Sequence, residues 1–438
     1  MGFRLNRALL LLLVSLEIFA TATNALASGF AITEQSVRGL GNAFSGSAAA
    51  EDASTIFFNP AGLTRLTGSS VAGAGYYIFP SAIFQNQGST IITGAPLTGS
   101  NGGDAGVNVF VPNLYAAWDL SDRVKIGLGI NSPFGLKTKY NGDWVGRYQA
   151  VNSELTTINI NPTLAAKLTD NLSVGIGVNL QYAEAELSNA IDFGLVGFGA
   201  GLRTRPQRSD GFVKLTGNDW SWGYNLGVLY EPSRKTRIGL AYRSSIAHEL
   251  QGDANFTVPA TATALTATGR FTDTGAKTAL DLPETVSLSA YHQLSPRLAA
   301  TADVTWTNWS RFKELRVQFD NPIEPDSVQP ENWHDAFRYS LGINYALSNA
   351  WELRAGVAYD ESPIDDKYIT PRIPDNNRTW VTIGASYKAS DSLSFDIGYA
   401  HLFVDDAEIN QESTTSGTLR GKFDSQVDIV GVQLNWRF

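Results

Sequence analysis

The final nine residues constrain the fold of this chain more than any other stretch. Two sets of side chains alternate along them, an apolar set (Val430, Val432, Leu434, Trp436 and Phe438) and a small or polar set (Gly431, Gln433, Asn435 and Arg437). A period of two with aromatic residues at one end is typical of a strand that faces lipid. An edge strand of a soluble sandwich is the alternative, but so apolar an edge would promote aggregation. The segment therefore favours a membrane β-barrel.

Short turns and long connections alternate along the chain, and they set the number of strands. Short turns lie at 120–122, 168–170, 231–233, 294–296, 347–349 and 389–391. Longer polar or Gly-rich connections lie near 87–104, 134–150, 191–217, 255–278, 320–335, 362–375 and 410–417. Short periplasmic turns and longer external loops are the arrangement of outer-membrane barrels. These six turns and seven loops join fourteen strands. We therefore predict an all-β fold, a transmembrane antiparallel β-barrel over residues 69–438, with both of its ends on the periplasmic side.

The run from Leu298 to Trp306 indicates which side chains face the lumen. Its even-numbered residues are apolar, whereas Thr301, Asp303 and Thr305 form the polar set and should point inward. Beyond Trp306 the apolar residues, such as Leu315, are odd-numbered. A bulge between the two parts would reconcile the registers.

The first residues have the pattern of an export signal. Arg4 and Arg7 precede an apolar run, and Ala25-Leu26-Ala27 supplies the small-x-small pattern of a cleavage site. Residues 1–27 are therefore predicted to be a signal peptide. No later stretch reaches the roughly 18 apolar residues that a helical span needs. A membrane location thus requires a barrel, in the outer membrane of a Gram-negative bacterium.

Charge and composition argue against several classes of function. The chain has a formal net charge of −9 and no cysteine. An acidic chain is a poor nucleic-acid binder, and without cysteine there are no disulfides, thiolate metal sites or Cys nucleophiles. The four histidines are scattered, and no serine sits in a recognisable nucleophile elbow. We therefore expect no enzyme, no catalytic residue, no metal site and no cofactor, in a protein that acts as a monomer.

Residues 28–68 form a Gly/Ala/Ser-rich stretch before the first predicted strand. The stretch lacks a run of charges and carries many apolar side chains, namely Phe30, Ile32, Val37, Leu40, Phe44, Ile56, Phe57 and Phe58. A segment so apolar is unsuited to staying extended in water. We predict that it is an N-terminal helical hatch that plugs the lumen, which makes the chain a plugged transporter in preference to an open sieve.

Two local signals indicate short helices in this stretch. Val37, Leu40 and Phe44 are spaced for one face of a helix, although two intervening glycines weaken it, so that it would need a surrounding wall. Asn59 suits a helix cap, and Pro60 suits the first helical position, where no N–H is missed.

The same stretch, with several later motifs, resembles a known family. GFAITEQSVRGLGNAFSG and EDASTIFFNPAGL closely resemble the hatch of the FadL-type long-chain fatty acid and hydrocarbon transporters of Gram-negative outer membranes. Residues 131–136, 335–339, 360–363 and 372–375 are also similar to that family. The resemblance covers nearly all of the mature chain and implies a fourteen-stranded barrel, which agrees with the count of turns. It implies passive uptake of long-chain fatty acids, or of monoaromatic or alkane hydrocarbons by the same route.

The resemblance also implies where substrate binds. It favours a first, loose groove on the external loop 133–148, whose aromatic, apolar and basic contacts are Phe134, Leu136, Trp144, Arg147 and Tyr148. A loop packed on itself or touching lipopolysaccharide phosphates is the alternative. Arg316 matches a basic position of the family's inner pocket. Glu184, Glu186 and Asn189 stand where the fatty-acid member has basic residues, which leaves room for a neutral hydrocarbon.

In the family, substrate leaves sideways through a hole made by a kink in the third strand. That strand falls at 124–133 here, where Gly and Pro suggest a break. The implied exit residues are Gly127, Gly129, Asn131 and Pro133, with a harmless strand end as the alternative. The implied gating residues of the hatch are Ser28, Gly29, Phe30, Asn59, Pro60 and Ala61. A shift of the hatch around residues 28–30 is expected to join the inner pocket to the hole.

Hydrophobic small molecules are the expected partners, with outer-membrane lipid and lipopolysaccharide around the barrel. A terminal aromatic residue such as Phe438 resembles the signal that the outer-membrane assembly machinery reads. A porin for hydrophilic solutes is the strongest rival hypothesis. Such a porin would lack an apolar plug and would narrow its lumen with an inward loop and charged walls.

Overall fold

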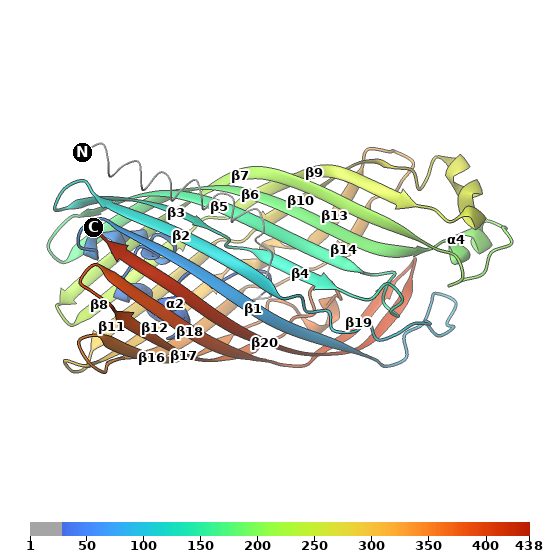
Figure 1. Cartoon of the computed structure of the whole chain (residues 1–438). Coiled ribbons are helices and arrows are strands. Elements are labelled where there is room, and N and C mark those ends of the chain that lie inside the picture. Colours follow the sequence, from blue (N-terminus) through green and yellow to red (C-terminus); the bar gives the residue numbers. More distant parts are fainter. Residues whose placement is uncertain (1–28) are drawn as a thin grey trace.

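Antiparallel strands wind into a closed barrel in the computed structural model, which describes residues 29–438 (Figure 1). The strands are β1 (Ser70–Asn86), β2 (Val109–Asp119), β3 (Val124–Asn131), β4 (Gly135–Lys139), β5 (Asn152–Lys167), β6 (Leu172–Asp192), β7 (Asp210–Ser233), β8 (Thr236–Arg243), β9 (Ile246–Thr257), β10 (Thr274–Leu282), β11 (Thr285–Gln293), β12 (Leu298–Thr307), β13 (Glu314–Phe319), β14 (Ser327–Pro330), β15 (Ala336–Ala346), β16 (Trp351–Asp360), β17 (Arg378–Lys388), β18 (Leu393–Val404), β19 (Ala407–Ser413) and β20 (Gly417–Arg437). The helical segments are α2 (Val37–Leu40), η1 (Ser47–Ala49), α3 (Thr55–Phe58), η2 (Pro60–Arg65), α4 (Phe193–Gly199), η3 (Ala260–Thr268), η4 (Trp309–Arg311) and η5 (Asp366–Tyr368). The predicted signal peptide and Ser28 lie outside the described residues.

Six barrel strands are interrupted, so the twenty strand segments make up fourteen barrel strands. The interrupted strands are β3/β4, β8/β9, β10/β11, β12/β13, β14/β15 and β18/β19, whose two parts share neighbouring strands. Pairing of β1 with β20, from Ser70↔Arg437 to Asn86↔Gly421, closes the ring. The fourteen antiparallel strands predicted from the turns are confirmed.

The strands extend further into the external loops than the sequence predicts. The connection predicted at 191–217 shrinks to 193–209 because β6 and β7 stay paired up to Asp192↔Asp210. The connections predicted near 255–278, 320–335 and 410–417 are shortened in the same way by β9, β10, β14, β19 and β20. Outside the bilayer the outer face of a hairpin does not have to be apolar. The backbones of its two strands therefore stay paired where the alternation of apolar and polar side chains is lost from the sequence.

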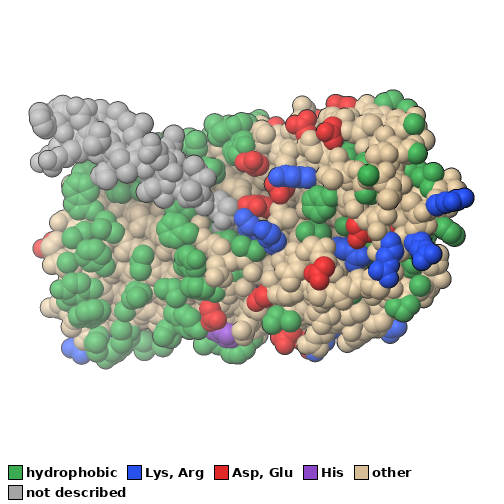
Figure 2. Space-filling view, turned by 45° about the vertical axis from the view of Figure 1, so that its right-hand side comes forward, with side chains coloured by type: hydrophobic (Ala, Val, Ile, Leu, Met, Phe, Trp, Pro, Cys, Tyr) green, Lys and Arg blue, Asp and Glu red, His purple; other side chains and the backbone are tan. Residues whose placement is uncertain are grey.

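Apolar side chains face outward on one half of the barrel. On β20, Val430, Val432 and Leu434 are exposed while Gln433 is buried, as the alternation predicts. Figure 2 shows hydrophobic side chains gathered over the half near the chain termini, and most acidic and basic side chains over the other half. The described part of the chain contains no helix that is both long and apolar enough to cross a membrane.

Residues 29–68, here called the plug, pack inside the barrel. α2 contacts β17, β18 and β20, η1 contacts β8, β11 and β12, and η2 contacts β3, β5, β6 and β7. The blue helices of Figure 1 accordingly lie within the ring of strands. Wall glycines allow this approach, since a Cβ on Gly384 would lie 2.7 Å from Cα of Gly41 and a Cβ on Gly175 would lie 2.5 Å from N of Ala61. The lumen is therefore filled by the chain itself.

The two helix signals of the plug have different outcomes. The Asn59 side chain accepts a hydrogen bond from N of Ala61 at 3.1 Å, with Pro60 in the first position of η2, as predicted. The helix through Val37 and Leu40 is a single turn and does not reach Phe44, whose φ is +56°. The prediction of a face that includes Phe44 is therefore wrong, because the chain turns after Leu40.

Candidate functional site

A cavity lies between the plug and the barrel wall. It encloses about 1030 Å³ of atom-free space, including its mouth. Apolar contributions come from both sides, with Ile32, Phe44, Phe57 and Phe58 from the plug and Phe134, Ala241 and Trp309 from the wall and the segments above it. A mostly apolar lining with a few polar groups is typical of small-molecule sites. It can take up an apolar molecule that water excludes.

Phe30 is held in an aromatic box at the top of the plug. Its ring centroid lies 4.7 Å from that of Trp309, 5.6 Å from Trp333, 5.7 Å from Phe312 and 6.2 Å from Phe134. All five side chains are buried. The box exists because β12/β13 and β14/β15 leave the wall at 308–313 and 331–335 and bend inward. The predicted bulge after Trp306 is thus confirmed as a break in register, and it is larger than a single bulge.

Gly29 fits this box only because it lacks a side chain. Its φ is +60°, and a Cβ there would lie 2.6 Å from the Trp333 ring. Its N–H donates to Oδ2 of Asp375 at 3.0 Å, and Asp375 is paired with Arg378. Burial raises the pKa of the Asp375 carboxyl. The first described residues of the plug are therefore tied to the loop after β16.

The third barrel strand is broken beside the plug. Pairing of β2 with β3 ends at Leu114↔Ile130, and the chain turns inward at 132–134 before β4 begins. Plug residues take the place of the missing strand, since N of Ile32 donates to O of Pro133 at 2.8 Å and N of Gly135 donates to O of Phe30 at 2.9 Å. We call this place, where residues 30–35 back the gap between β2 and the kink, the seam.

Polar side chains complete the seam. Nε2 of Gln35 donates to O of Ser132 at 2.9 Å, and its Oε1 accepts from the Tyr115 hydroxyl at 3.1 Å. Nδ2 of Asn113 donates to O of Glu34 at 2.8 Å. The Glu34 carboxylate itself is fully buried and has no hydrogen-bond partner among residues 29–438. Burial raises the pKa of Glu34 to about 7.

Two of the predicted exit residues lie at the break and two lie below it. Pro133 is in the kink, and Asn131 ends β3. Gly127 and Gly129 lie lower and face the plug, where added Cβ atoms would lie 2.6 and 3.2 Å from the side chain of Ile56. These two glycines admit the plug to the wall and do not form the kink.

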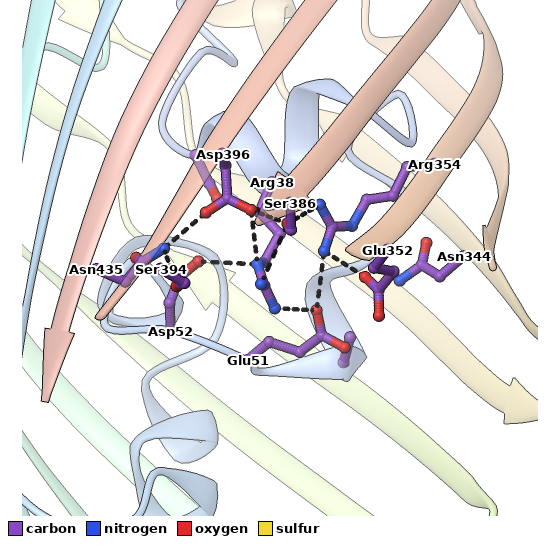
Figure 3. A network of polar contacts seen from close by, with 12 residues as sticks. Arg38, Glu51, Asp52, Asn344, Glu352, Arg354, Ser386, Ser394, Asp396 and Asn435 are labelled. Carbon is purple, nitrogen blue, oxygen red and sulfur yellow. Dashed lines mark hydrogen bonds and ion pairs between the residues drawn. The ribbon is translucent and has the colours of Figure 1, made fainter. Parts of the chain in front are cut away.

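An ionic latch, made of Arg38, Glu51, Asp52, Arg354 and Asp396, fixes the lower part of the plug (Figure 3). Arg38 contacts Glu51 at 2.8 Å and Asp396 of β18 at 3.3 Å. Arg354 of β16 contacts the same two carboxylates at 3.9 and 3.4 Å. Next to the latch, Oε1 of Gln433 accepts from N of Val37 and its Nε2 donates to Asp52, both at 2.9 Å. Plug and wall are thus bonded through charges that are buried on the wall side, at Arg354 and Asp396, and partly exposed on the plug side, at Arg38 and Glu51.

Asn59, Pro60 and Ala61, predicted to gate, belong to this lower part. Nδ2 of Asn59 donates to O of Val228 at 3.0 Å. Gly227 makes room for this contact, since a Cβ there would lie 2.1 Å from Oδ1 of Asn59. The motif therefore anchors η2 against β7.

The external loop 133–148 does not expose the groove expected there. The side chains of Trp144, Arg147 and Tyr148 are buried, with Trp144 stacked on Tyr140 at 3.9 Å and Arg147 paired with Asp210 at 2.8 Å. Phe134 and Leu136 are also buried, and Phe134 lines the cavity. The loop packs on itself and across the barrel mouth, as in the alternative considered above, because its aromatic side chains bury more apolar area that way. Binding of substrate by this loop stays a prediction.

Arg316, expected in the inner pocket, does not line the cavity. It is exposed on β13 and pairs with Glu314 at 2.6 Å and Asp326 at 3.1 Å. The basic residues that do line the cavity are Arg243 and Arg338. The alternation of β8 carries a signal for Arg243, since Gly239, Ala241 and Arg243 share the inward phase.

The whole described barrel corresponds to a known family. Residues 18–438 match the family model for outer membrane protein transport proteins (OMPP1/FadL/TodX). The chain belongs to this family. The family consists of transport channels, so the protein is a transport protein of the outer membrane of Gram-negative bacteria.

Individual members of the OMPP1/FadL/TodX family are similar over almost their full length. The chain is 30% identical to a putative outer membrane protein of Neisseria meningitidis, over 95% of this chain and 96% of that one. It is 28% identical to the long-chain fatty acid transport protein of Escherichia coli K12, over 97% and 98%. A crystal structure of a Pseudomonas aeruginosa FadL homologue is 25% identical and superposes with a TM-score of 0.87, over 94% of this chain and all of that one. The Pseudomonas putida toluene transporter TodX shares the fold at 18% identity, with a TM-score of 0.66 over 88% of this chain and 94% of that one.

Proposed function

We propose that the protein carries long-chain fatty acids passively across the outer membrane, by way of the cavity and the seam. The observation that supports this most is that the cavity and the seam share residues. Ala31, Ile32, Pro133 and Phe134 line the cavity and also form the contact that closes the wall gap. A rearrangement of residues 29–35 therefore opens the cavity to the bilayer without moving the rest of the plug.

An apolar route suits an alkyl chain on energetic grounds. Each buried CH₂ contributes about 0.8 kcal/mol relative to water, so a long chain enters an apolar cavity and then the bilayer without crossing water. Passage is driven by dilution or consumption of the substrate, since the sequence contains no apparent nucleotide loop or energy-coupling motif. The relative named a long-chain fatty acid transport protein supports this substrate class.

The roles of the individual residues follow from their places. Phe134 and Leu136 guide substrate near the kink, Gly29 and Phe30 gate, and Asn131 and Pro133 border the exit. Trp144, Arg147 and Tyr148 hold the mouth in shape. Phe438, exposed at the end of the barrel, is proposed to be read during assembly, and the outer loops are proposed to contact lipopolysaccharide.

Uptake of labelled oleate tests the proposal. A strain that lacks its own transporter should take up oleate faster when it expresses this chain than when it carries the empty vector. Equal uptake would contradict the proposal. Parallel uptake of toluene and of a long-chain alkane tests the alternative substrate class, the neutral hydrocarbons. This alternative stays open because Glu184 and Glu186 stand where the fatty-acid member of the family has basic residues. Permeation of sugars through liposomes tests the porin hypothesis, for which a filled lumen predicts a negative result.

A further inference from the structure

Arg243 is a buried cation that lacks an acidic partner. Its side chain lines the cavity and is 9% exposed. Within residues 29–438, Arg243 forms no ion pair, and its guanidinium donates to Oδ1 of Asn179 and to O of Phe57. Buried charges are normally paired. The cavity thus contains a guanidinium whose counter-charge the described chain does not supply.

The carboxylates of the cavity lie elsewhere. Asp303 and Asp360, which line the cavity, are charged neighbours of Arg338, and Asp360 is the cross-strand partner of Arg338. Arg243 is level with Thr285 and Thr307 in the pairing of β8, β11 and β12, whereas Asp303 is four residues further down β12. Two strand spacings of about 4.8 Å and four residue rises of about 3.3 Å separate the two positions by ~16 Å. At one end of the cavity, the negative charges of the carboxylates are therefore balanced by Arg338. At the other end, the positive charge of Arg243 is not balanced.

A row of asparagines, here called the amide ladder, fixes Arg243. Its members are Asn131, Asn159, Asn161, Asn179 and Asn225, all buried. Nδ2 of Asn159 donates to Asn131 at 3.2 Å and to Asn179 at 3.0 Å, and Nδ2 of Asn179 donates to Asn225 at 3.2 Å. Nη1 of Arg243 donates to Oδ1 of Asn179 at 2.5 Å, and its Nη2 donates to O of Phe57 at 3.0 Å.

The amide ladder holds the guanidinium without neutralising it. Asparagine accepts hydrogen bonds but carries no charge, so the positive charge of Arg243 stays available at the cavity wall. The Phe57 ring lies under the guanidinium at 4.3 Å, and Phe58 and Ile32 continue the apolar lining. A fixed cation beside apolar surface fits a molecule with one anionic end and an apolar tail.

We propose that Arg243 is the carboxylate anchor of this cavity and that the amide ladder positions it. The inference rests on the proposed function and deepens it: the substrate is a monocarboxylate with an alkyl tail, and a neutral hydrocarbon binds without using Arg243. Because the ladder ends at Asn131, beside the kink, the anchor and the seam belong to one hydrogen-bonded unit.

Matched ligands on purified full-length protein test this inference. Dodecanoate and 1-dodecanol have the same tail and differ in charge, so their dissociation constants are measured on the wild type, Arg243→Gln and Arg243→Lys at pH 8. Charged hydrogen bonds of this kind are worth about a 10- to 100-fold difference in affinity. We expect Arg243→Gln to weaken dodecanoate by that factor and to leave 1-dodecanol within about 2-fold, with Arg243→Lys between. Arg316→Gln is the matched control, because that arginine lies outside the cavity, and it should change neither ligand.

Several outcomes would overturn the inference. If Arg243→Gln weakens the affinities for dodecanoate and 1-dodecanol equally, or weakens neither, Arg243 is not a carboxylate anchor. Either result leaves the proposed transport of apolar molecules standing. If the wild type binds neither ligand, the proposed function fails as well. Asn179→Ala keeps the cation but removes its support, and it should lower the acid-to-alcohol affinity ratio about 3- to 10-fold. If Arg243→Gln does not fold, the pH dependence of binding to the wild type tests the inference. At pH values below about 5 dodecanoate is protonated, so its affinity should decrease there, while the affinity for 1-dodecanol should not change.

Discussion

The two ends of the plug are held by different kinds of contact. The lower end, around Arg38 and Asn59, is joined to the wall by ion pairs to the buried Asp396 and Arg354 and by hydrogen bonds to β7, β18 and β20. The upper end, residues 29–35, is held by aromatic packing around Phe30 and by backbone bonds to an inward kink. Buried charges are costly to separate, whereas aromatic packing can be replaced by another apolar molecule. The lower end is therefore a fixed base, and the upper end is the part that a substrate can displace.

Removing the whole plug should have the largest effect. With residues 29–68 deleted behind the predicted export signal, the wall glycines that face Gly41 and Pro60 border an empty lumen. Planar-bilayer recordings should show large, unselective ion currents that the intact protein lacks. Unchanged conductance would mean that the plug does not seal the barrel.

Breaking the ionic latch should destabilise the base of the plug. Asp396→Asn leaves Arg38 and Arg354 with less compensation in a buried site, at a cost of about 3–5 kcal/mol. A lower thermal midpoint and faster proteolysis within residues 36–66 are the expected readouts. Asp170→Asn, whose exposed partner is Arg123, is the control and should cost under about 1 kcal/mol. A latch variant as stable as this control would remove the basis for a fixed lower end.

Emptying the aromatic box should release the upper end alone. Phe30→Ala removes a ring buried among four others, worth about 3 kcal/mol. The chain has no cysteine, so Thr33→Cys and Thr64→Cys report separately on the two ends of the plug. In the Phe30→Ala background, maleimide labelling at position 33 should accelerate while labelling at position 64 stays slow. Equal acceleration at both positions would show that the plug moves as one body.

The upper end should also loosen as the pH rises. Glu34 is buried and its pKa is raised to about 7 against an ordinary value of 4.5, so the folded seam favours the protonated acid. The charged groups facing it are Arg338, Arg378 and Asp360. The stabilisation of the folded seam by the protonated Glu34 carboxyl is complete below about pH 4.5 and is lost as the pH rises toward 7. Labelling of Thr33→Cys, corrected for maleimide reactivity with a model thiol, should therefore rise between pH 5 and 7.5, and Glu34→Gln should abolish that rise.

Removing one cap from the base should have the smallest effect. Asn59→Ala deletes the bond to N of Ala61 and the bond to β7, for about 1 kcal/mol. We expect a small drop in the thermal midpoint and no change in substrate selectivity. A loss of uptake at normal stability would instead place Asn59 in the gate.

The barrel could be predicted from the sequence because the patterns that indicate it, alternating strands and short turns, lie within short stretches of the chain. Alternation in β12 and β20 follows from each strand having one face toward lipid and one toward the lumen, and the turns between them are short and polar. The cap at Asn59 is equally local. The breaks in β12/β13 and β14/β15 were harder, because a change of phase shows that register is lost but not that the chain bends inward.

The site depends on contacts between distant parts of the chain, which composition does not reveal. Phe30 meets Trp309 and Trp333, which lie at the breaks of the ninth and tenth of the fourteen barrel strands. The aromatic loop containing Trp144 has the same composition whether it packs on itself or faces solvent, and the structure shows the first. Arg316 lies on β13 and does not line the cavity, while the alternation of β8 places Arg243 on the inward face without indicating which cavity it lines.

The position of the plug before β1 has a consequence for biogenesis. The ring closes only where β1 meets β20, so it stays an open sheet until the final strand has arrived. In the closed barrel the plug touches β6, β7 and β18, and Arg38 reaches β18 from inside. We therefore expect the cylinder to be rolled around the plug, since a plug that arrived later would have to be threaded into a finished tube.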